Sequence, residues 1–232
     1  MFIISEIFPQ HSGNIKVAEQ MILQSKIAGA DAVKVQLYEA NQFGAERAYL
    51  ELDYKNLEHL KTFSDAVNID LLATPFTLER LEWCTELKLR YLKVPSRMHT
   101  ENPDLVHKIL DKKITTFVSV PENYDPNKLK IVNHAVYLYC IPRYPVKLDE
   151  VTLPDFNHSI FKGISDHTLG YSVALYASAH GAQYLEKHFT LSHSFQKETE
   201  KAHLCAMTIE ELSLIKIIST EFEIIRGSTH EL

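Results

Sequence analysis

The sequence predicts an α/β fold in one domain, a compact (β/α)8 TIM barrel. Strand-like and helix-like segments alternate through all 232 residues without a break in composition. Such alternation implies parallel strands joined by right-handed crossovers, and eight such units close into a barrel. A doubly wound open sheet is the alternative, but no Gly-x-Gly-x-x-Gly follows the first strand and the chain has only seven glycines. We therefore expect one barrel over residues 1–232.

The first half of the chain supplies four strand-and-helix units. Residues 14–28 show how a helix is recognised, because apolar side chains recur there at helical spacing and the pattern stops before Gly29. Prolines close three of the four strands, at Pro9, Pro75 and Pro95. The expected strands are residues 2–8, 32–37, 69–73 and 91–94, and the expected helices are residues 14–28, 54–67, 78–87 and 103–110.

The second half supplies four more strands. Two of them are residues 115–120 and 136–140, and the last two end on histidines, at Ser165-Asp166-His167 and Glu186-Lys187-His188. The expected helices are residues 126–132, 173–181 and 208–225, whereas residues 147–157 have no clear pattern.

Composition excludes several classes of protein. The chain is 45% hydrophobic and 23% charged, with a formal charge of -6, which argues against a nucleic-acid surface. It has no run of about 18 apolar residues and no basic, cleavable start, so we expect a cytoplasmic protein without a membrane span. Cys84, Cys140 and Cys205 are odd in number and widely spaced, which predicts reduced thiols.

Polar residues stand at or just past the end of every expected strand. They are Glu6, Lys34, Gln36, Thr74, Lys93, Ser96, Ser119, Tyr144, Ser165, His167, Glu186 and His188. In barrels of this kind the active-site residues lie at the C-terminal ends of the strands. Lys34 and Lys93 lie inside strands, and with the nearby hydroxyls they indicate a pocket for a phosphate or a carboxylate. The same lysines could instead extend to the barrel rim, and Glu6 could serve only as their buried counter-ion.

The last two strands place histidines at matching positions. Ser165 and His167 share one strand face, and Glu186 and His188 share the equivalent face of the next strand. Parallel neighbours lie about 4.8 Å apart, so both imidazoles can converge on one point. The pair therefore indicates half of a divalent-metal site, whereas either histidine alone is more typical of a hydrogen-bonded core residue.

A series of short motifs resembles a known family. The motifs are Ile-Ser-Glu-Ile near the start, Ala-Gly-Ala-Asp-Ala-Val-Lys-Val-Gln at 28–36, Ala-Thr-Pro-Phe at 73–76, Lys-Val-Pro-Ser at 93–96, Tyr-Pro at 144–145, Gly-Ile-Ser-Asp-His-Thr-Leu-Gly at 163–170 and Glu-Lys-His-Phe-Thr at 186–190. In this order they are similar to the sialic acid synthase family. Its members condense phosphoenolpyruvate with an N-acetylated hexosamine, such as N-acetylmannosamine, to give a nonulosonic acid.

The resemblance implies a role for each matching residue. The positions that match the family's phosphoenolpyruvate site are Lys34, Thr74, Lys93, Ser96, Ser119 and Ser165. His167 and His188 match its metal ligands, usually for manganese, with magnesium or cobalt as alternatives. Glu6 and Tyr144 match positions near the sugar and the reacting centre, so Glu6, Lys93 and Tyr144 are the expected catalytic residues.

The acceptor half of the site departs from the family pattern. Ser96-Arg97-Met98 replaces the usual Ser-Gly-Glu, and Ile141-Pro142-Arg143 replaces a segment with an asparagine before Tyr144. We therefore expect a different or modified acceptor, such as a phosphorylated hexosamine, with contacts from Gln36, Arg97, Arg143 and His203. The family's antifreeze-like C-terminal domain is not expected here, so any homodimer would form without the domain swap that this domain provides.

Two other functions remain open at this point. One is a lyase or phosphatase-like activity on phosphoenolpyruvate or a related keto acid, with the same metal. The other is a non-catalytic or altered-chemistry paralogue that binds phosphoenolpyruvate or a related ligand within a sugar-biosynthetic complex. Retained polar residues in the barrel interior argue against loss of function, because buried polar groups without a partner destabilise the fold.

Overall fold

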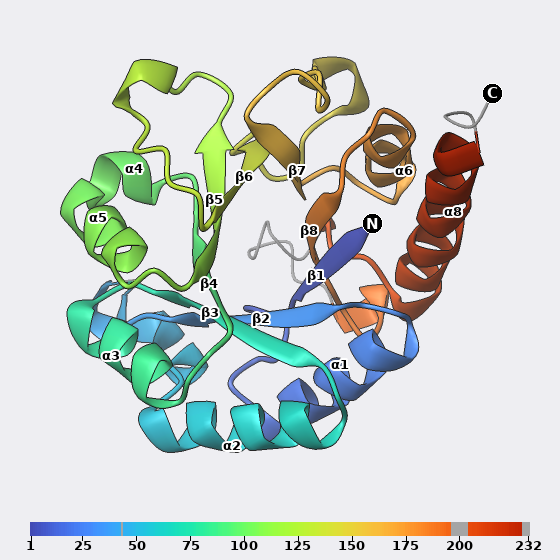
Figure 1. Ribbon diagram of the computed structural model, residues 1–232. Coiled ribbons are helices and arrows are strands. Elements are labelled where there is room, and N and C mark those ends of the chain that lie inside the picture. The colour runs from blue at the N-terminus through green and yellow to red at the C-terminus, as the bar shows by residue number, and fades with distance from the viewer. Residues whose placement is uncertain (43, 196–203, 229–232) are drawn as a thin grey trace.

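Eight parallel strands close into a barrel in residues 1–42, 44–195 and 204–228, which are the residues that this computed structural model describes (Figure 1). The strands follow one another around the barrel in sequence order, and β8 pairs with β1. Their bounds are β1 Phe2–Glu6, β2 Ala32–Leu37, β3 Asp70–Pro75, β4 Tyr91–Val94, β5 Thr115–Pro121, β6 Ala135–Cys140, β7 Phe161–Asp166 and β8 Tyr184–His188. The predicted (β/α)8 barrel is confirmed.

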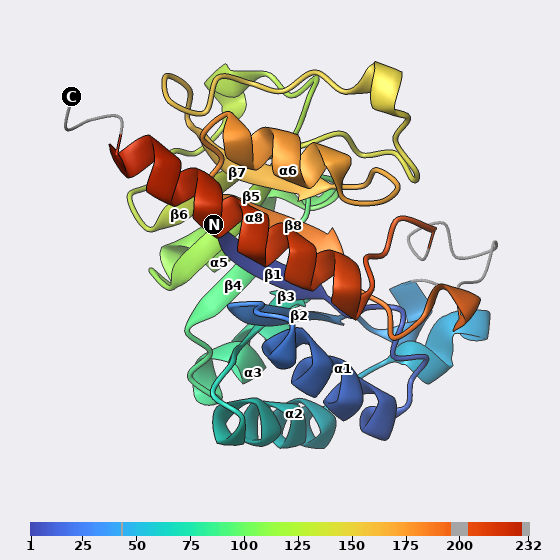
Figure 2. The ribbon, with the colours of Figure 1, turned by 90° about the vertical axis from the view of Figure 1, so that its right-hand side faces the viewer.

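Helices cover the outside of the barrel (Figures 1 and 2). The α-helices are α1 Ile15–Ile27, α2 Tyr54–Ala66, α3 Leu78–Glu86, α4 Met98–Glu101, α5 Pro103–Asp111, α6 Ser172–Ala179 and α8 Ile209–Ser228. Short 3-10 helices are η1 Ala40–Gln42, η2 Ala45–Leu50, η3 Pro126–Lys128, η4 Leu148–Glu150 and η5 His193–Phe195. Within the described ranges, no helix combines the length and the apolarity that a membrane crossing requires.

The helix predicted over residues 126–132 was wrong. The structure forms only the 3-10 turn Pro126–Lys128 there. The Tyr137 hydroxyl donates a hydrogen bond to the Lys130 carbonyl oxygen at 2.8 Å and accepts one from the Val132 backbone N–H at 3.0 Å. Because these bonds occupy backbone groups that a helix would need, the connection from β5 to β6 contains no α-helix.

Five of the described helices end in the same way, with one residue in the left-handed region. The φ angles are 94° at Gly29 after α1, 57° at Asn68 after α2, 53° at Lys88 after α3, 58° at Lys113 after α5 and 98° at Gly181 after α6. After α3, the Leu89 backbone N–H bonds to the Cys84 carbonyl oxygen at 3.0 Å, which satisfies a carbonyl at the helix end. Glycine adopts this conformation without a steric penalty, whereas lysine does not.

Lys88→Gly is therefore expected to raise the free energy of unfolding by about 0.5–1 kcal/mol. Denaturant unfolding followed by circular dichroism measures the change. Lys88→Ala is the matched control, because it removes the side chain and keeps the strained backbone, and it should not stabilise the protein. Equal stabilisation by both variants would show that the lysine side chain, and not its backbone conformation, is unfavourable.

An apolar layer fills the barrel below the C-terminal ends of the strands. Its buried residues are Ile4, Ala32, Leu72, Phe117 and Leu138, with Phe2, Tyr91 and Tyr184 packed against them. Because side chains alternate along a strand, the residue two positions later also points inward. These next positions hold Glu6, Lys34, Thr74, Lys93, Ser119, Cys140, Ser165 and Glu186. Each strand thus contributes one polar or thiol side chain just above the apolar layer.

Gly163 allows β7 to approach β8 closely. It pairs with Tyr184 in the same register that pairs Ser165 with Glu186. A Cβ atom at Gly163 would lie 1.9 Å from the Tyr184 carbonyl oxygen, a separation that the backbone could accept only by moving. The missing side chain therefore permits the register that brings the ends of β7 and β8 together.

Candidate active site

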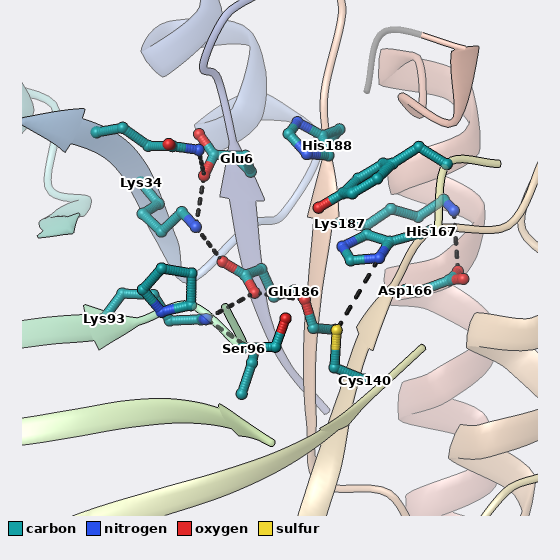
Figure 3. Close-up of a pocket in the computed structure, with 15 residues that line it drawn as sticks. Glu6, Lys34, Lys93, Ser96, Cys140, Asp166, His167, Glu186, Lys187 and His188 are labelled. Carbon is teal, nitrogen blue, oxygen red and sulfur yellow. Dashed lines mark hydrogen bonds and ion pairs between the residues drawn. The ribbon is translucent and has the colours of Figure 1, made fainter. Parts of the chain in front are cut away.

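A pocket opens at the C-terminal ends of the strands. It encloses about 390 Å³, part of which is open to solvent. The residues that line it are Glu6, Lys34, Gln36, Lys93, Pro95, Ser96, Ser119, Cys140, Tyr144, Ser165, Asp166, His167, Glu186, Lys187 and His188 (Figure 3). Most of the residues predicted from the sequence are among them, including both lysines and both histidines.

Glu186 is the electrostatic centre of the pocket. Its carboxylate forms ion pairs with Lys34 and with Lys93, the latter at 3.3 Å between Nζ and Oε2, and it accepts a hydrogen bond from Ser165 Oγ at 2.7 Å (Figure 3). Lys34 also pairs with Glu6 at 2.5 Å. Sequence reasoning placed Glu186 on the same strand face as His188 but assigned it no role, because its contact with Lys93 crosses the barrel between strands that are not neighbours.

Burial and charge shift the pKa values of these carboxyl groups in opposite directions. Burial by itself would raise the pKa of Glu186, but the two lysines outweigh it and hold this pKa far below the usual range. Burial raises the pKa of Glu6, because the attraction of Lys34 offsets it only in part and Glu186 repels a second negative charge. The pocket therefore holds one permanent carboxylate and one carboxyl group suited to proton exchange.

The two lysines differ in the same way. Burial lowers the pKa of Lys93 to about 8, although Glu186 opposes this shift. For Lys34, the effect of burial is overcome by Glu186 and Glu6, so its pKa is raised. Lys93 Nζ donates to Ser119 Oγ at 2.7 Å and to the Val94 carbonyl oxygen at 3.0 Å. Lys93 is thus fixed beside a hydroxyl and Lys34 beside two carboxyl groups, and both ammonium groups line a pocket that can bind a phosphate or a carboxylate.

Thr74 lies in the same inward position of β3 but outside the pocket lining. It is fully buried, and in the described part of the structure its hydroxyl has no hydrogen-bond partner. It pairs in register with Gln36 of β2, which does line the pocket. A buried hydroxyl without a partner is unfavourable, but this one does not face the pocket, so the ligand contact expected of Thr74 from the sequence stays a prediction.

Cys140 completes the pocket wall at the end of β6, and sequence reasoning gave it no part in the site. Its Sγ atom lies 4.0 Å from His167 Nδ1. Burial raises the pKa of the thiol to about 11, so the thiolate is not populated near neutral pH. Cys140 therefore contributes a neutral thiol to the pocket wall.

His167 and His188 face each other across the pocket with ring centroids 6.3 Å apart. Imidazole nitrogens bind first-row metals at about 2.1 Å, so two rings that share an ion lie within about 6.5 Å of each other. Burial lowers the pKa of His167 to about 4, and burial together with the charge of His167 lowers that of His188 well below its usual value. Both rings are therefore neutral near pH 7, as metal binding requires.

Hydrogen bonds also orient the two rings. His167 Nδ1 lies 2.9 Å from the Ile141 carbonyl oxygen, so this nitrogen carries the proton and Nε2 keeps a free lone pair. A backbone carbonyl is a typical partner of a metal-binding histidine. At His188 the partner is the side-chain amide of Gln10, whose Nε2 lies 3.3 Å from the ring Nδ1. In the described residues no group of three or more His, Cys, Asp or Glu side chains is arranged to hold a metal ion. The candidate metal site therefore consists of two histidine ligands.

Tyr144 lies beside both histidines. Its ring centroid is 4.0 Å from that of His167 and 5.9 Å from that of His188. Burial raises its pKa well above the usual value, with further contributions from Cys140 and other nearby acidic groups. The phenol therefore keeps its proton and can donate a hydrogen bond into the pocket.

The arginines predicted as acceptor contacts lie outside the pocket lining. Arg143 forms ion pairs with Glu122 at 2.9 Å and with Glu150 at 3.5 Å. The Arg97 guanidinium lies 4.9 Å from the ring centroid of Phe76 and 3.7 Å from the Glu101 carboxylate. Glu101 follows Arg97 at helical spacing, whereas the partners of Arg143 lie in other segments and were not readable from the sequence. His203, the remaining predicted contact, lies outside the described residues.

Comparison with known proteins gives consistent matches. The NeuB family model matches residues 45–231. An N,N'-diacetyllegionaminic acid synthase of Campylobacter jejuni is 32% identical over 87% of this chain and 71% of its own length. An uncharacterised protein of Methanocaldococcus jannaschii is 30% identical over 84% of this chain, which spans 64% of that protein. The solved N-acetylneuraminic acid synthetase of Leptospira borgpetersenii has the same fold, with a TM-score of 0.86 at 24% identity over 97% of this chain and 85% of that one.

Proposed function

Because the chain belongs to the NeuB family, we propose that it condenses phosphoenolpyruvate with an N-acetylated hexosamine to give a nonulosonic acid and phosphate. Family membership confirms the resemblance drawn from the sequence motifs, and the chain is an enzyme of the nonulosonic acid synthase class. The relative from Campylobacter jejuni is named for a diacetylated product, which supports an N-acetylated acceptor.

The buried cluster of Lys34, Glu186 and Lys93 is the observation that carries this proposal. Two ammonium groups share one carboxylate at the bottom of a pocket, and the hydroxyls of Ser119 and Ser165 lie beside them. Lys34 also pairs with Glu6, whose raised pKa allows this carboxyl group to take up a proton when an anion binds to the lysines. Phosphoenolpyruvate carries a phosphate and a carboxylate, and each of these groups can pair with one of the two ammonium groups.

The residues of the pocket divide the chemical work between them. Lys34 and Lys93 hold the phosphate and carboxylate and stabilise the negative charge that develops when C3 of phosphoenolpyruvate attacks the sugar aldehyde. A water molecule then adds at C2, and the bond between C2 and the bridging phosphate oxygen breaks, which releases phosphate and leaves the oxygen of the water as the C2 carbonyl. Glu6, with its raised pKa, accepts and returns a proton during these steps, and the Tyr144 hydroxyl donates a hydrogen bond to the reacting oxygen.

His167 and His188 would hold a divalent metal, which we propose is manganese, with magnesium and cobalt as alternatives. Their neutral rings, the hydrogen bond that leaves His167 Nε2 free and the 6.3 Å between the centroids fit such an ion. When bound, the metal supplies Lewis acidity toward the aldehyde oxygen. The protein contributes the orientation of the two rings and the walls that keep the pocket partly closed to water.

The acceptor sugar would enter above Glu6 and Gln36. Gln36 lines the pocket, and its Nε2 donates to Glu6 Oε2 at 3.3 Å, so its amide can turn toward a sugar hydroxyl. Arg97 and Arg143 carry positive charge at the same end of the barrel, but both are paired with carboxylates. This pairing favours an uncharged hexosamine over the phosphorylated acceptor that the sequence first suggested.

Isothermal titration of phosphoenolpyruvate into metal-free and manganese-loaded protein tests the proposal. Binding should disappear in Lys93→Ala and persist in Lys147→Ala, which removes an exposed lysine from the segment between β6 and β7. Manganese uptake should disappear in His188→Ala. Equal binding by the wild type and Lys93→Ala would exclude this pocket as the phosphoenolpyruvate site.

The pKa of Lys93 predicts how binding depends on pH. Lys93 loses its proton as the pH rises through about 8. Phosphate monoesters have their second pKa near about 6, so the ligand does not change charge in this range. We expect the affinity for phosphoenolpyruvate to be constant between pH 7 and the pKa of Lys93 and to fall by up to about tenfold per pH unit above it. Lys93→Arg, which stays charged, should remove this dependence, and an unchanged fall in that variant would assign the titration to another group.

A further inference from the structure

Asp166 and Lys187 form an ion pair that the proposed reaction does not use. They are partners in the register of β7 and β8, and each directly precedes one of the two histidines. Their side chains are 1% and 0% exposed, and Lys187 Nζ lies 2.9 Å from Asp166 Oδ2. Figure 3 shows the pair on the side of these strands away from Glu186. Because side chains alternate along a strand, the histidine side chains lie on the opposite face, although Asp166 and Lys187 also line part of the pocket.

The same pair also holds Thr168, the residue after His167. Asp166 Oδ1 accepts hydrogen bonds from the Thr168 backbone N–H at 2.9 Å and from Thr168 Oγ1 at 2.7 Å. Lys187 Nζ donates to the Thr168 carbonyl oxygen at 2.7 Å. His167 is therefore held between two residues that share one network of hydrogen bonds. This network ties the end of β7 to β8 at the level of the two imidazoles.

Packing alone does not require charges at these positions. The attraction within a buried ion pair offsets the desolvation cost of the two charges only when their geometry is good. Apolar residues of similar volume often stabilise a fold equally well. A buried ion pair can fix the register of two strands, because a shift of either strand would leave both charges buried without a partner. We propose that Asp166 and Lys187 are positioning residues that set the ends of β7 and β8 so that the rings of His167 and His188 face the same point. The inference rests on the proposed function only for the metal that these rings would bind.

The test compares two double variants of the full chain. Asp166→Asn with Lys187→Met removes both charges together, and asparagine can still accept the bonds from Thr168. Asp31→Asn with Lys216→Met is the matched control, because Asp31 and Lys216 form an ion pair at 2.9 Å between α8 and the residue before β2, at the far end of the barrel. Three quantities are measured: the thermal midpoint, the affinity for Mn²⁺ alone by titration calorimetry, and the imidazole ¹⁵N resonances of metal-free protein.

A positioning role predicts a specific pattern. The Asp166/Lys187 double variant should bind Mn²⁺ about 10–100-fold more weakly and should lose the hydrogen-bonded Nδ1–H resonance of His167, which His167→Gln identifies. The control should keep both properties even where its thermal midpoint falls equally. Wild-type Mn²⁺ affinity and an unchanged His167 resonance in a folded Asp166/Lys187 variant would overturn the inference. If the wild type binds no Mn²⁺, the proposed metal is wrong, and the ¹⁵N resonances alone decide on positioning.

Discussion

Lys34→Met is expected to abolish phosphoenolpyruvate binding and to destabilise the protein. Lys34 is the cation that Glu6 and Glu186 share, and both carboxyl groups are almost completely buried. Removal of one partner from a buried charge pair typically lowers stability by about 3–5 kcal/mol. Loss of a buried, hydrogen-bonded charge from a binding site weakens affinity by about 2–5 kcal/mol, which is at least about 30-fold. Chemical unfolding and titration calorimetry measure the two effects.

A second substitution separates these effects. In Lys34→Met with Glu6→Gln, the remaining Lys93 and Glu186 form a balanced pair, so most of the lost stability should return. Phosphoenolpyruvate binding should not return, because the pocket still lacks one of its two ammonium groups. Recovery of binding together with stability would mean that Lys34 supports the fold and does not contact the ligand.

Gly163→Ala is expected to disrupt the barrel between β7 and β8. The added Cβ atom would lie 1.9 Å from the carbonyl oxygen and 2.6 Å from the carbonyl carbon of Tyr184. These are backbone atoms, so no change of rotamer can relieve the contact. Overpacking against flexible side chains costs about 1–3 kcal/mol, and we expect a larger loss here, above about 3 kcal/mol. The free energy of unfolding by denaturant and the yield of soluble protein report the loss.

Gly227→Ala is the control for this change. Gly227 lies near the end of α8, and an added Cβ atom would meet nothing within 4 Å. Alanine has a higher helix propensity than glycine, so this variant should be neutral or more stable by up to about 1 kcal/mol. Equal stability of Gly163→Ala and the wild type would show that β7 and β8 separate easily, which would also weaken the positioning role of Asp166 and Lys187.

The alternation of strands and helices and the residue types at the strand ends were sufficient to predict the fold and most of the pocket. Period-two alternation places Ser165 with His167 and Glu186 with His188, and all four line the pocket. The absence of a helix over residues 126–132 was not predictable in this way, because the hydroxyl of Tyr137, in the later strand β6, binds the backbone groups of Lys130 and Val132.

The pairing of charges in the pocket also could not be predicted from the sequence. Glu186 contacts Lys93 across the barrel, and no rule of local spacing relates β8 to β4. Asp166 and Lys187 lie next to the histidines in the sequence, but the ion pair between them depends on the register of β7 with β8. Arg143 finds Glu122 and Glu150 in two different connections, which local spacing does not reveal.

Mass spectrometry of a single reaction mixture tests the central claim most directly. The protein is incubated with Mn²⁺, phosphoenolpyruvate and a set of N-acetylated hexosamines, and Lys34→Met serves as the inactive control. We expect a product whose mass equals that of one sugar plus pyruvate, formed together with an equal amount of phosphate and absent from the control. Consumption of phosphoenolpyruvate without incorporation of any sugar would contradict the account and would indicate a lyase or phosphatase in the same pocket.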